Sequence, residues 1–404
     1  MSTPRSSGGS LPRFITPTAF LMIATAMNSM SFASWQSLIN NFGKDSFGAS
    51  GYEIGLQQSI REIPGLLAFT AIFCLVFVRE QRLAVIAVGI MGIGIALTGF
   101  FPSALGFYTT TLIMSVGFHY YETMNQSLSL QWFSVAEAPV RLGRIMSASA
   151  FAQILGYGLI FALAAWFHAP YVTMFLSFGG LAFAAAVYLG LAFPHFPQKV
   201  VQRSGLVMRR RYWLYYALNF MTGARRQIFT VFAAWLMVER FNYRVEEVAA
   251  LFLINCVFNL IMAPKIGGLI LRFGERAAIV SENFSLMFVF IAYALVENAN
   301  IAAALYVIDN AFFSLSIAQK TYFQKIADSA DIAPTAGVAF SINHIAAVFI
   351  PFLLGLLWLE SRSAVFYCGA GFAAVSMVLG FLIPRQPGHG RETAFSAHVA
   401  APAE

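Results

Sequence analysis

The sequence predicts an all-α integral membrane protein with twelve transmembrane helices in two pseudo-symmetric six-helix bundles. Three observations support this fold class: the composition, the spacing of the apolar runs and an internal repeat. Of the 404 residues, 59% are hydrophobic and 11% are charged, whereas soluble domains carry about 25% charged residues. The formal net charge of +7 could indicate nucleic acid, but the basic residues fall in short loops between apolar runs, so we expect no nucleic-acid partner.

Apolar runs of about 20 residues, the length that crosses a bilayer, recur along the chain. We predict spans at 14–40, 52–78, 83–101, 104–131, 145–167, 170–193, 212–239, 246–271, 277–296, 299–326, 336–359 and 362–383. The first run is too long for the core of a signal peptide, so we expect it to be retained. Residues 1–13 form a polar tail, and residues 384–404 form a second one that we expect to be disordered.

The basic residues predict the orientation. Sixteen of the 25 Lys and Arg residues fall on the side of both tails and of the linker at 194–211, and four fall on the opposite side. The positive-inside rule therefore predicts that both tails and this linker are cytoplasmic, in a bacterial inner membrane. The linker separates an N-terminal bundle at 14–193 from a C-terminal bundle at 212–383.

The two bundles repeat in sequence at an offset of 194 residues. The matched pairs are Glu53 and Glu247, Arg82 and Arg276, Gln126 and Lys320, Glu137 and Asp331, Gly143 and Gly337, and Ser147 and Ser341. Parallel six-helix repeats of this kind are typical of secondary transporters.

A family resemblance adds to this interpretation. The segment Gly-Gly-Leu-Ile-Leu-Arg-Phe-Gly-Glu-Arg at 267–276 resembles the signature between the second and third helices of the major facilitator superfamily, with Leu271 where an acid is usual. The resemblance covers about residues 14–383. It implies the major facilitator fold, alternating access, and a central cavity lined by the first, fourth, seventh and tenth helices. It also implies a gating role for Gly267, Arg272, Gly274, Arg276 and Arg82.

Two adjacent arginines lie at the midpoint of the seventh span. Arg225 and Arg226 would each cost about 2.5–3.5 kcal/mol in the centre of a membrane helix, so they must face water, a ligand or buried acids. As a structural pair they would bind Glu62, Glu122 or Asp309. As a functional pair they would clamp an anion, because a guanidinium matches carboxylate or phosphate.

Further ionisable residues lie in the second and fourth spans. Arg61 and Glu62 form either an ion pair that holds helices together or part of the cavity. His119 and Glu122 lie one turn apart on one face of the fourth span, which is typical of a proton relay. Tyr121 and Asn125 form an adjacent polar face of the same helix, and we expect them to contact substrate.

The remaining candidates are spread over several spans. We expect Asn28, Asp309 and Asn310 to bind substrate, and Glu62, Asp309 and His344 to take part in proton coupling with His119 and Glu122. Gln153, Asn255 and Asn259 are weaker candidates, because helix–helix hydrogen bonding explains many such residues. We expect Glu282 to lie near the inner interface, paired with a nearby basic residue.

These residues predict a secondary transporter rather than an enzyme. The sequence contains no Walker loop, no His-Glu-x-x-His motif and no paired cysteines, so we expect no cofactor and no metal. Deep in the spans, five basic side chains oppose three acidic ones, which favours an organic anion as substrate and protons as the coupling ion. We expect a monomer surrounded by lipid. Efflux of an apolar drug or metabolite, and a non-transporting assembly or sensor protein on the same scaffold, are the alternatives.

Overall fold

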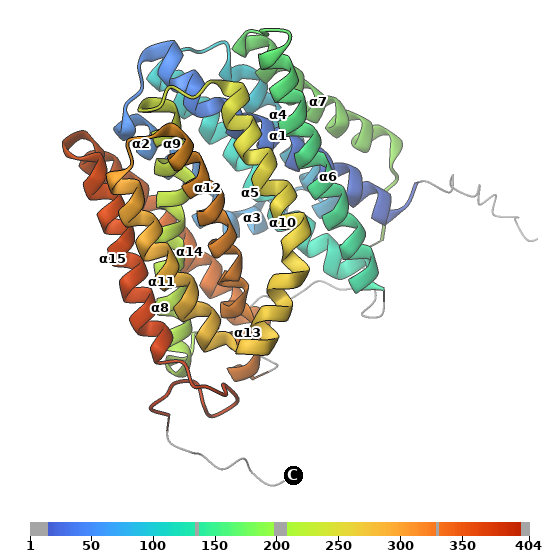
Figure 1. The fold of residues 1–404 in the computed structure, drawn as a ribbon. Helices are drawn as coiled ribbons and strands as arrows, with labels where there is room; N and C mark the ends of the chain where they lie inside the picture. The colour runs from blue at the N-terminus through green and yellow to red at the C-terminus, as the bar shows by residue number, and fades with distance from the viewer. Residues whose placement is uncertain (1–14, 134–136, 198–207, 329–330, 397–404) are drawn as a thin grey trace, which may run out of the picture.

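A computed structural model describes residues 15–133, 137–197, 208–328 and 331–396. Within these residues the chain is helical, and the only β-structure is an isolated bridge between Gly388 and Arg391. Figure 1 shows the N-terminal half, coloured blue to green, beside the C-terminal half, coloured yellow to red. The predicted tail at 1–13 and residues 198–207 of the predicted linker lie outside the described residues.

Each predicted span coincides with a helix or with a consecutive run of helices. The N-terminal half contains α1 (Pro17–Phe47), α2 (Gly51–Leu66), η1 (Ala68–Thr70), α3 (Ala71–Cys74), α4 (Glu80–Thr98), α5 (Ala104–Trp132), α6 (Ala138–Ala165) and α7 (Tyr171–Ala192). The C-terminal half contains η2 (Arg210–Tyr212), α8 (Trp213–Gln227), the π-helix η3 (Ile228–Ala233), α9 (Ala234–Glu239), α10 (Val245–Phe273), α11 (Glu275–Leu295), α12 (Ala299–Phe313), η4 (Ser314–Ser316), α13 (Ile317–Ile326), α14 (Ile332–Glu360) and α15 (Arg362–Phe381).

Hydropathy divides these spans into two groups. Among the described residues, eight spans are long and apolar enough to cross a membrane: α4, α6, α7, α10, α11, α12 with α13, α14 and α15. The other predicted spans are α1, α2 with α3, α5, and α8 with α9. All four of these contribute side chains to one charged cavity, which explains their greater polarity.

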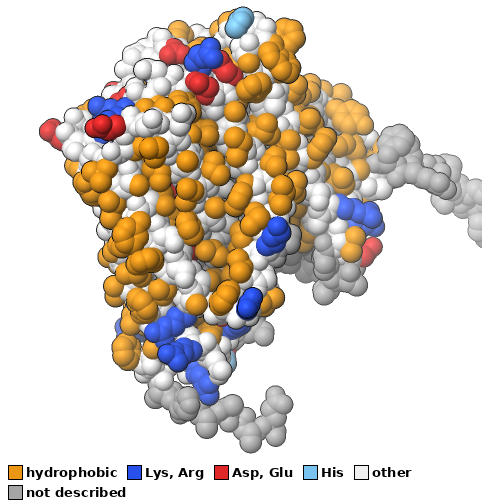
Figure 2. Space-filling model, in the orientation of Figure 1, with side chains coloured by type: hydrophobic (Ala, Val, Ile, Leu, Met, Phe, Trp, Pro, Cys, Tyr) orange, Lys and Arg blue, Asp and Glu red, His pale blue; other side chains and the backbone are white. Residues whose placement is uncertain are grey.

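The outer surface has the distribution expected of a membrane protein. Figure 2 shows hydrophobic side chains over the sides of the molecule and charged side chains gathered toward its two ends. Large apolar side chains that are strongly exposed include Phe77 and Leu191. An exposed apolar surface of this extent is stable only against lipid or a partner.

The repeat is visible in the helix starts. The Glu53 carboxylate accepts a hydrogen bond of 2.8 Å from the backbone N–H of Ser50 at the start of α2. The Glu247 carboxylate accepts a bond of 2.8 Å from the backbone N–H of Arg244 at the start of α10. The same capping interaction thus recurs 194 residues later.

The hydrophobic cores show that the halves meet at only one end. One core, which includes Phe42 of α1, Trp235 of α9 and Trp358 of α14, joins both halves at the end away from the linker. At the linker end each half has a separate core, one around Phe20 and the other around Tyr212. The described conformation is therefore closed away from the linker and divided toward it.

Polar contacts and close packing seal the closed end. Asn41 Nδ2 donates to the carbonyl oxygen of Tyr243 at 2.7 Å, and Lys44 Nζ donates to the carbonyl oxygen of Val238 at 2.6 Å. The helices α2 and α14 approach so closely that a Cβ atom on Gly55 would lie 2.3 Å from the carbonyl oxygen of Pro351. Only glycine fits at this crossing of the two halves.

The expectation that the tail at 384–404 is disordered is wrong for its described part, residues 384–396. The tail folds back under the C-terminal half, where the Tyr322 hydroxyl donates to the carbonyl oxygen of Glu392. The backbone N–H of Ala394 donates to the carbonyl oxygen of Leu382 at 2.7 Å. These polar tail residues are ordered because they bind the end of the bundle.

Candidate functional site

A cavity of about 270 Å³ lies between the two halves. Its polar wall, which defines the charged cavity, consists of Gln36, Asn40, Gln57, Gln58, Arg61, Glu62, His119, Glu122, Arg226, Gln227, Thr230, Asn343 and His344. Its aromatic wall consists of Phe32, Trp35, Phe118, Phe252 and Phe340. The wall thus includes the second, eighth and eleventh spans, in addition to the first, fourth and seventh.

An ion pair in α2 forms the centre of the charged cavity. The Arg61 guanidinium lies 2.5 Å from Glu62 Oε1 and over the Phe32 ring, 5.3 Å from its centroid. Gln58 Nε2 donates to Glu62 Oε1 and to Gln227 Oε1, each at 3.1 Å. Gln58 therefore links the ion pair to α8 of the opposite half.

Two histidines complete this cluster from both halves. His344 Nε2 of α14 lies 3.5 Å from Glu62 Oε2, and His344 Nδ1 lies 3.0 Å from the carbonyl oxygen of Phe340. The His119 ring of α5 contacts the His344 ring with a centroid distance of 5.4 Å. Buried His119 Nε2 has no hydrogen-bond partner in the described part of the chain, so it can accept or donate a proton.

The same three residues are close enough to hold a metal ion, but the local charge opposes one. Ligand atoms of Glu62, His119 and His344 lie within 4.8 Å of one another. The guanidinium groups of Arg61 and Arg226 line the same cavity and would repel a divalent cation. The cluster is therefore a poor site for a divalent cation.

Glu122 lies on the cavity wall with an exposed side chain. Asn28 Nδ2 is 3.5 Å from Glu122 Oε1, and Asn28 itself is buried behind the wall. Tyr121 is fully buried, with its hydroxyl 2.7 Å from Thr25 Oγ1, and Asn125 contacts the same threonine. Asn28 and Tyr121 are thus buried between helices in this conformation, whereas Asn125 is half-buried. None of the three lines the charged cavity, and their contact with substrate stays a prediction.

The two adjacent arginines have different environments. Arg225 is buried and lies 2.6 Å from Glu282 Oε1, with both side chains at most 1% exposed. The expected pairing of Glu282 with a basic residue is confirmed, and Glu282 is none of the three acids that were expected as partners of Arg225. Arg226 is exposed in the charged cavity, so only Arg226 of this pair can bind a ligand there.

Asp309 lies beside the buried pair rather than in a cavity. Its side chain is 1% exposed, Asp309 Oδ2 has no hydrogen-bond partner among the described residues, and Arg225 acts on it electrostatically. Asp309 therefore lies within electrostatic range of Arg225, inside the C-terminal half. This position does not fit the substrate-binding role expected for Asp309.

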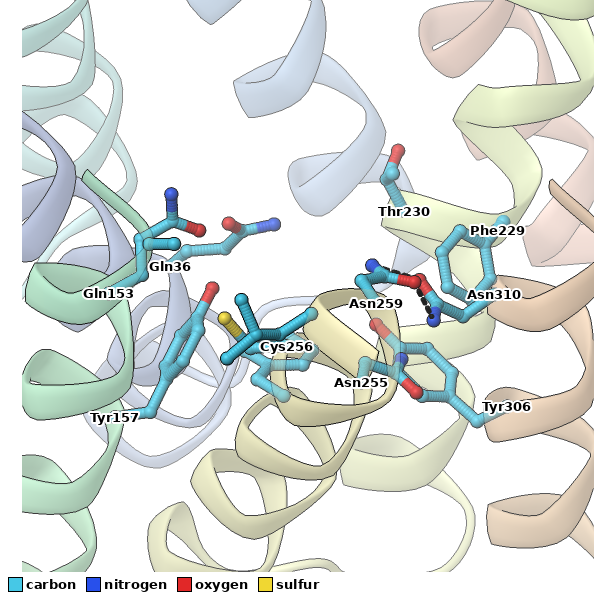
Figure 3. Close-up of a pocket in the computed structure, with 13 residues that line it drawn as sticks. Gln36, Gln153, Tyr157, Phe229, Thr230, Asn255, Cys256, Asn259, Tyr306 and Asn310 are labelled. Carbon is cyan, nitrogen blue, oxygen red and sulfur yellow. Dashed lines mark hydrogen bonds between the residues drawn. The ribbon is translucent and has the colours of Figure 1, made fainter. Parts of the chain in front are cut away.

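A second cavity, of about 400 Å³, adjoins the first. This neutral cavity is lined by Gln36, Ala150, Gln153, Tyr157, Phe229, Thr230, Phe252, Asn255, Cys256, Asn259, Leu260, Tyr306 and Asn310. Figure 3 shows Gln36, Gln153 and Tyr157 on one side, facing Asn259, Asn310 and Phe229 on the other. Asn310 lies at a cavity, as expected, and the weaker candidates Gln153, Asn255 and Asn259 line the same cavity.

The neutral cavity begins where α8 changes its winding. The π-helix η3 starts at Ile228, two residues after Arg226, and carries Phe229 and Thr230. Thr230, Gln36 and Phe252 line both cavities. A π-helical turn shifts the direction of following side chains and is frequent at functional sites.

The predicted gating residues lie at the linker end. Gly274 has a φ of 82° and is the single residue between α10 and α11, so it makes a turn that other residues rarely adopt. Arg82 and Arg272 are exposed, Arg276 lies over the Phe381 ring, and Gly267 lies within α10.

Sequence reasoning missed the ion pair nearest to these gating residues. Lys325 Nζ lies 2.6 Å from Glu275 Oε1, and Glu275 is 3% exposed. The equivalent contact in the N-terminal half is a hydrogen bond of 2.7 Å from Gln131 Nε2 to Glu80 Oε2. Each contact lies within its own half, as expected where the halves are apart. The offset of 194 residues between Gln131 and Lys325 could have indicated that these two positions are equivalent in the repeat.

A further ionic cluster holds the end of the linker. Arg209 Nη2 donates to Asp331 Oδ1 at 2.8 Å, Arg211 pairs with Asp328, and the Tyr212 hydroxyl donates to Asp331 Oδ2 at 3.0 Å. The hydrogen bond from Arg209 lowers the pKa of Asp331. Because all of these residues belong to the linker and the C-terminal half, the cluster fixes the linker to that half.

Comparisons with known proteins agree with this architecture. The sequence model described as Major Facilitator Superfamily matches residues 18–351. A crystal structure of the nucleoside transporter NupG superposes with a TM-score of 0.73 at 13% identity, covering 90% of this chain and 98% of that one. A bacterial homologue of the human lysosomal transporter Spinster, in its inward-facing and occupied conformation, gives 0.70 at 14% identity, covering 93% and 98%.

A POT family transporter in complex with 5-aminolevulinic acid gives a TM-score of 0.71 at 12% identity, covering 91% of this chain and 95% of that one. No curated protein matches the sequence. At these identities the structural likeness establishes the fold alone, while the sequence match covers most of the chain. This chain belongs to the major facilitator superfamily, and it is a membrane transporter rather than an enzyme.

Proposed function

We propose that this transporter moves a small organic anion through the charged cavity by alternating access, in symport with protons. The observation that supports this most strongly is Arg226, which is exposed in the cavity and has no ion-pair or hydrogen-bond partner for its guanidinium among the described residues. A guanidinium binds carboxylate and phosphate in a bidentate manner. Arg61 supplies a second cation to the same cavity.

The charge balance of the cavity argues for one proton per negative charge of substrate. Arg61 and Arg226 are balanced by Glu62 and Glu122 when both acids are ionised and both histidines are neutral. A bound monoanion would leave a net negative charge in a low-dielectric site, which is costly. One added proton restores neutrality.

The cluster of Glu62, His119 and His344 is the proposed proton acceptor, and Glu122 the proposed entry point. Glu62 shares Arg61 with any anion that binds there, and Gln58 and His344 also contact its carboxylate. An anion that binds Arg61 and Arg226 weakens the ion pair between Arg61 and Glu62. Protonation of Glu62, or of a histidine beside it, compensates for this loss.

Coupling to the conformational change follows from where the cluster lies. Glu62 and His119 belong to the N-terminal half, and His344 belongs to the C-terminal half. Protonation therefore changes a contact that must break when the halves rock apart at their closed end. With the linker end cytoplasmic, as the basic residues predict, the described conformation opens inward.

The test uses purified monomeric protein in liposomes that contain a pH-sensitive dye. Benzoate, phenyl phosphate and neutral benzamide are added outside in turn, at equal internal and external pH. We expect anions to acidify the interior and benzamide to do nothing, with Arg226→Lys reducing the signal. Proton movement with benzamide, or anion uptake that leaves internal pH unchanged, would contradict the proposal.

A further inference from the structure

The neutral cavity differs chemically from the charged cavity that it adjoins. Among the described residues that line it there is no Lys, Arg, His, Asp or Glu. Its polar groups are the carboxamides of Gln36, Gln153, Asn255, Asn259 and Asn310 and the hydroxyls of Tyr157, Thr230 and Tyr306. A carboxamide can both donate and accept hydrogen bonds, so this lining fits an uncharged group with donors and acceptors.

Aromatic rings cover one side of the neutral cavity. The Tyr306 ring lies 4.8 Å from the Phe229 ring and 5.9 Å from the Phe252 ring, at interplanar angles of 32° and 29°. Tyr157 meets Phe252 edge-on, with a centroid distance of 5.6 Å. The aromatic side of the cavity can therefore contact a planar group of a ligand by stacked or edge-to-face packing.

One amide in this cavity lacks a partner. Asn255 is buried, and its Oδ1 atom accepts no hydrogen bond from the described residues. By contrast, Asn259 and Asn310 hydrogen-bond to each other at 3.0 and 3.3 Å. A buried acceptor without a donor costs about 1–3 kcal/mol, and a donor on a bound ligand would remove that cost.

The two cavities are close enough for one molecule to occupy both. Gln36, Thr230 and Phe252 line both of them. Thr230 lies one turn beyond Arg226, and its hydroxyl donates to the carbonyl oxygen of Arg226 at 2.9 Å. One turn is a rise of about 6 Å, so a short linker connects a group at Arg226 to a ring beside Thr230.

Resting on the proposed anion transport, we infer that the substrate is a ring-bearing acid. Its acidic group binds Arg226 and Arg61, and its uncharged planar ring, with hydrogen-bonding atoms on its edge, occupies the neutral cavity. A nucleoside monophosphate has this construction, since a sugar separates its ring from its acidic group.

The test compares matched probes on the purified full-length protein. Uridine 5′-monophosphate carries ring and phosphate, uridine lacks the acid, ribose 5-phosphate lacks the ring, and uridine 5′-carboxylate replaces phosphate by carboxylate. We expect the two bipartite probes to bind at least tenfold more tightly than uridine or ribose 5-phosphate. The tighter of the two identifies phosphate or carboxylate as the preferred acid.

Two variants assign the ring to the neutral cavity. Asn255→Leu removes an amide whose oxygen is unpartnered, so the free protein should remain stable, and Phe229→Leu removes part of the stacking face. Both variants should weaken the binding of uridine 5′-monophosphate at least tenfold while leaving the binding of ribose 5-phosphate unchanged. The control Asn219→Leu changes an α8 amide that bonds to the carbonyl oxygen of Tyr215 and should leave all probes unaffected.

The outcomes separate this inference from the proposed function. Equal binding of ribose 5-phosphate and uridine 5′-monophosphate overturns the ring inference and leaves anion transport standing. If uridine binds as tightly as uridine 5′-monophosphate and uridine 5′-carboxylate, anion recognition is overturned as well. Failure of both bipartite probes to bind, or equal weakening by Asn219→Leu and Asn255→Leu, also overturns the ring inference.

Discussion

Arg225 and Arg226 are adjacent, so substitutions of the two provide a matched comparison. Arg225 is 1% exposed and lies 2.6 Å from a Glu282 carboxylate that is fully buried. Removal of one partner from a buried ion pair costs about 3–5 kcal/mol, because the other charge remains without compensation. We therefore expect Arg225→Met to lose about that much unfolding free energy, and Arg226→Met, at an exposed position, to lose little.

Ligand binding should respond in the opposite way. Arg226→Lys keeps the charge but loses the bidentate fork, and loss of such a contact costs about 2–5 kcal/mol. That corresponds to a loss in affinity for uridine 5′-monophosphate of about 30-fold or more. Arg225→Lys should leave affinity nearly unchanged, because Arg225 does not line the cavity.

A double substitution tests the ion pair itself. Arg225→Met combined with Glu282→Leu removes both charges and should recover part of the lost stability. The assay is thermal unfolding followed by tryptophan fluorescence, with ligand affinity measured on each variant. Equal destabilisation by Arg225→Met and Arg226→Met, or equal loss of affinity in the two Lys variants, would refute this reasoning.

Three further predictions concern coupling, closure and pH. Glu122→Gln should abolish accumulation driven by a pH gradient while exchange of labelled for unlabelled substrate continues; gradient-driven uptake at the wild-type rate would exclude Glu122. Gly55→Ala should open the closed end, because the added Cβ would lie 2.3 Å from a backbone oxygen of α14. The control Gly158→Ala should not open it, because no atom lies within 4 Å of a Cβ at that position. A cysteine placed at Asn41 should be labelled faster in the Gly55 variant, and equal labelling of both variants would contradict the prediction. Arg209 lowers the pKa of Asp331 in the folded protein, so this contact stabilises the folded state fully above the unfolded pKa of about 3.9. The stabilisation is lost as the pH falls from that value through the folded pKa. Between pH 6 and pH 3 the melting temperature should therefore fall less steeply for Asp331→Asn than for the wild type, and parallel pH dependences would contradict this.

The sequence predicted the spans well because hydrophobic length is a local property. Each apolar run coincides with a helix or a run of helices, and the 194-residue offset appears as paired caps at Glu53 and Glu247. The tail was misjudged because its order depends on contacts such as Tyr322 with Glu392, which composition does not contain.

Individual roles of polar residues could be predicted only in part. Helical spacing says that Arg225 and Arg226 point in different directions, but not which one faces Glu282 in α11. Likewise, Tyr121 and Glu122 are neighbours, yet only Glu122 lines the cavity, because helix rotation is set by packing against the other helices. The grouping of Glu62, His119 and His344 needs three helices from two halves, so no local pattern could reveal it.

Hydropathy nevertheless carries information about the site that individual residues do not. The predicted spans that do not qualify as membrane helices by length and hydropathy are α1, α2, α5 and α8 with their continuations, and all four line the charged cavity. In a bilayer, a polar helix face is stable only against protein or water. Four such helices therefore have to face one another around a shared interior. The low apolarity of a span thus predicts its place at the cavity even where its individual residues do not predict their roles.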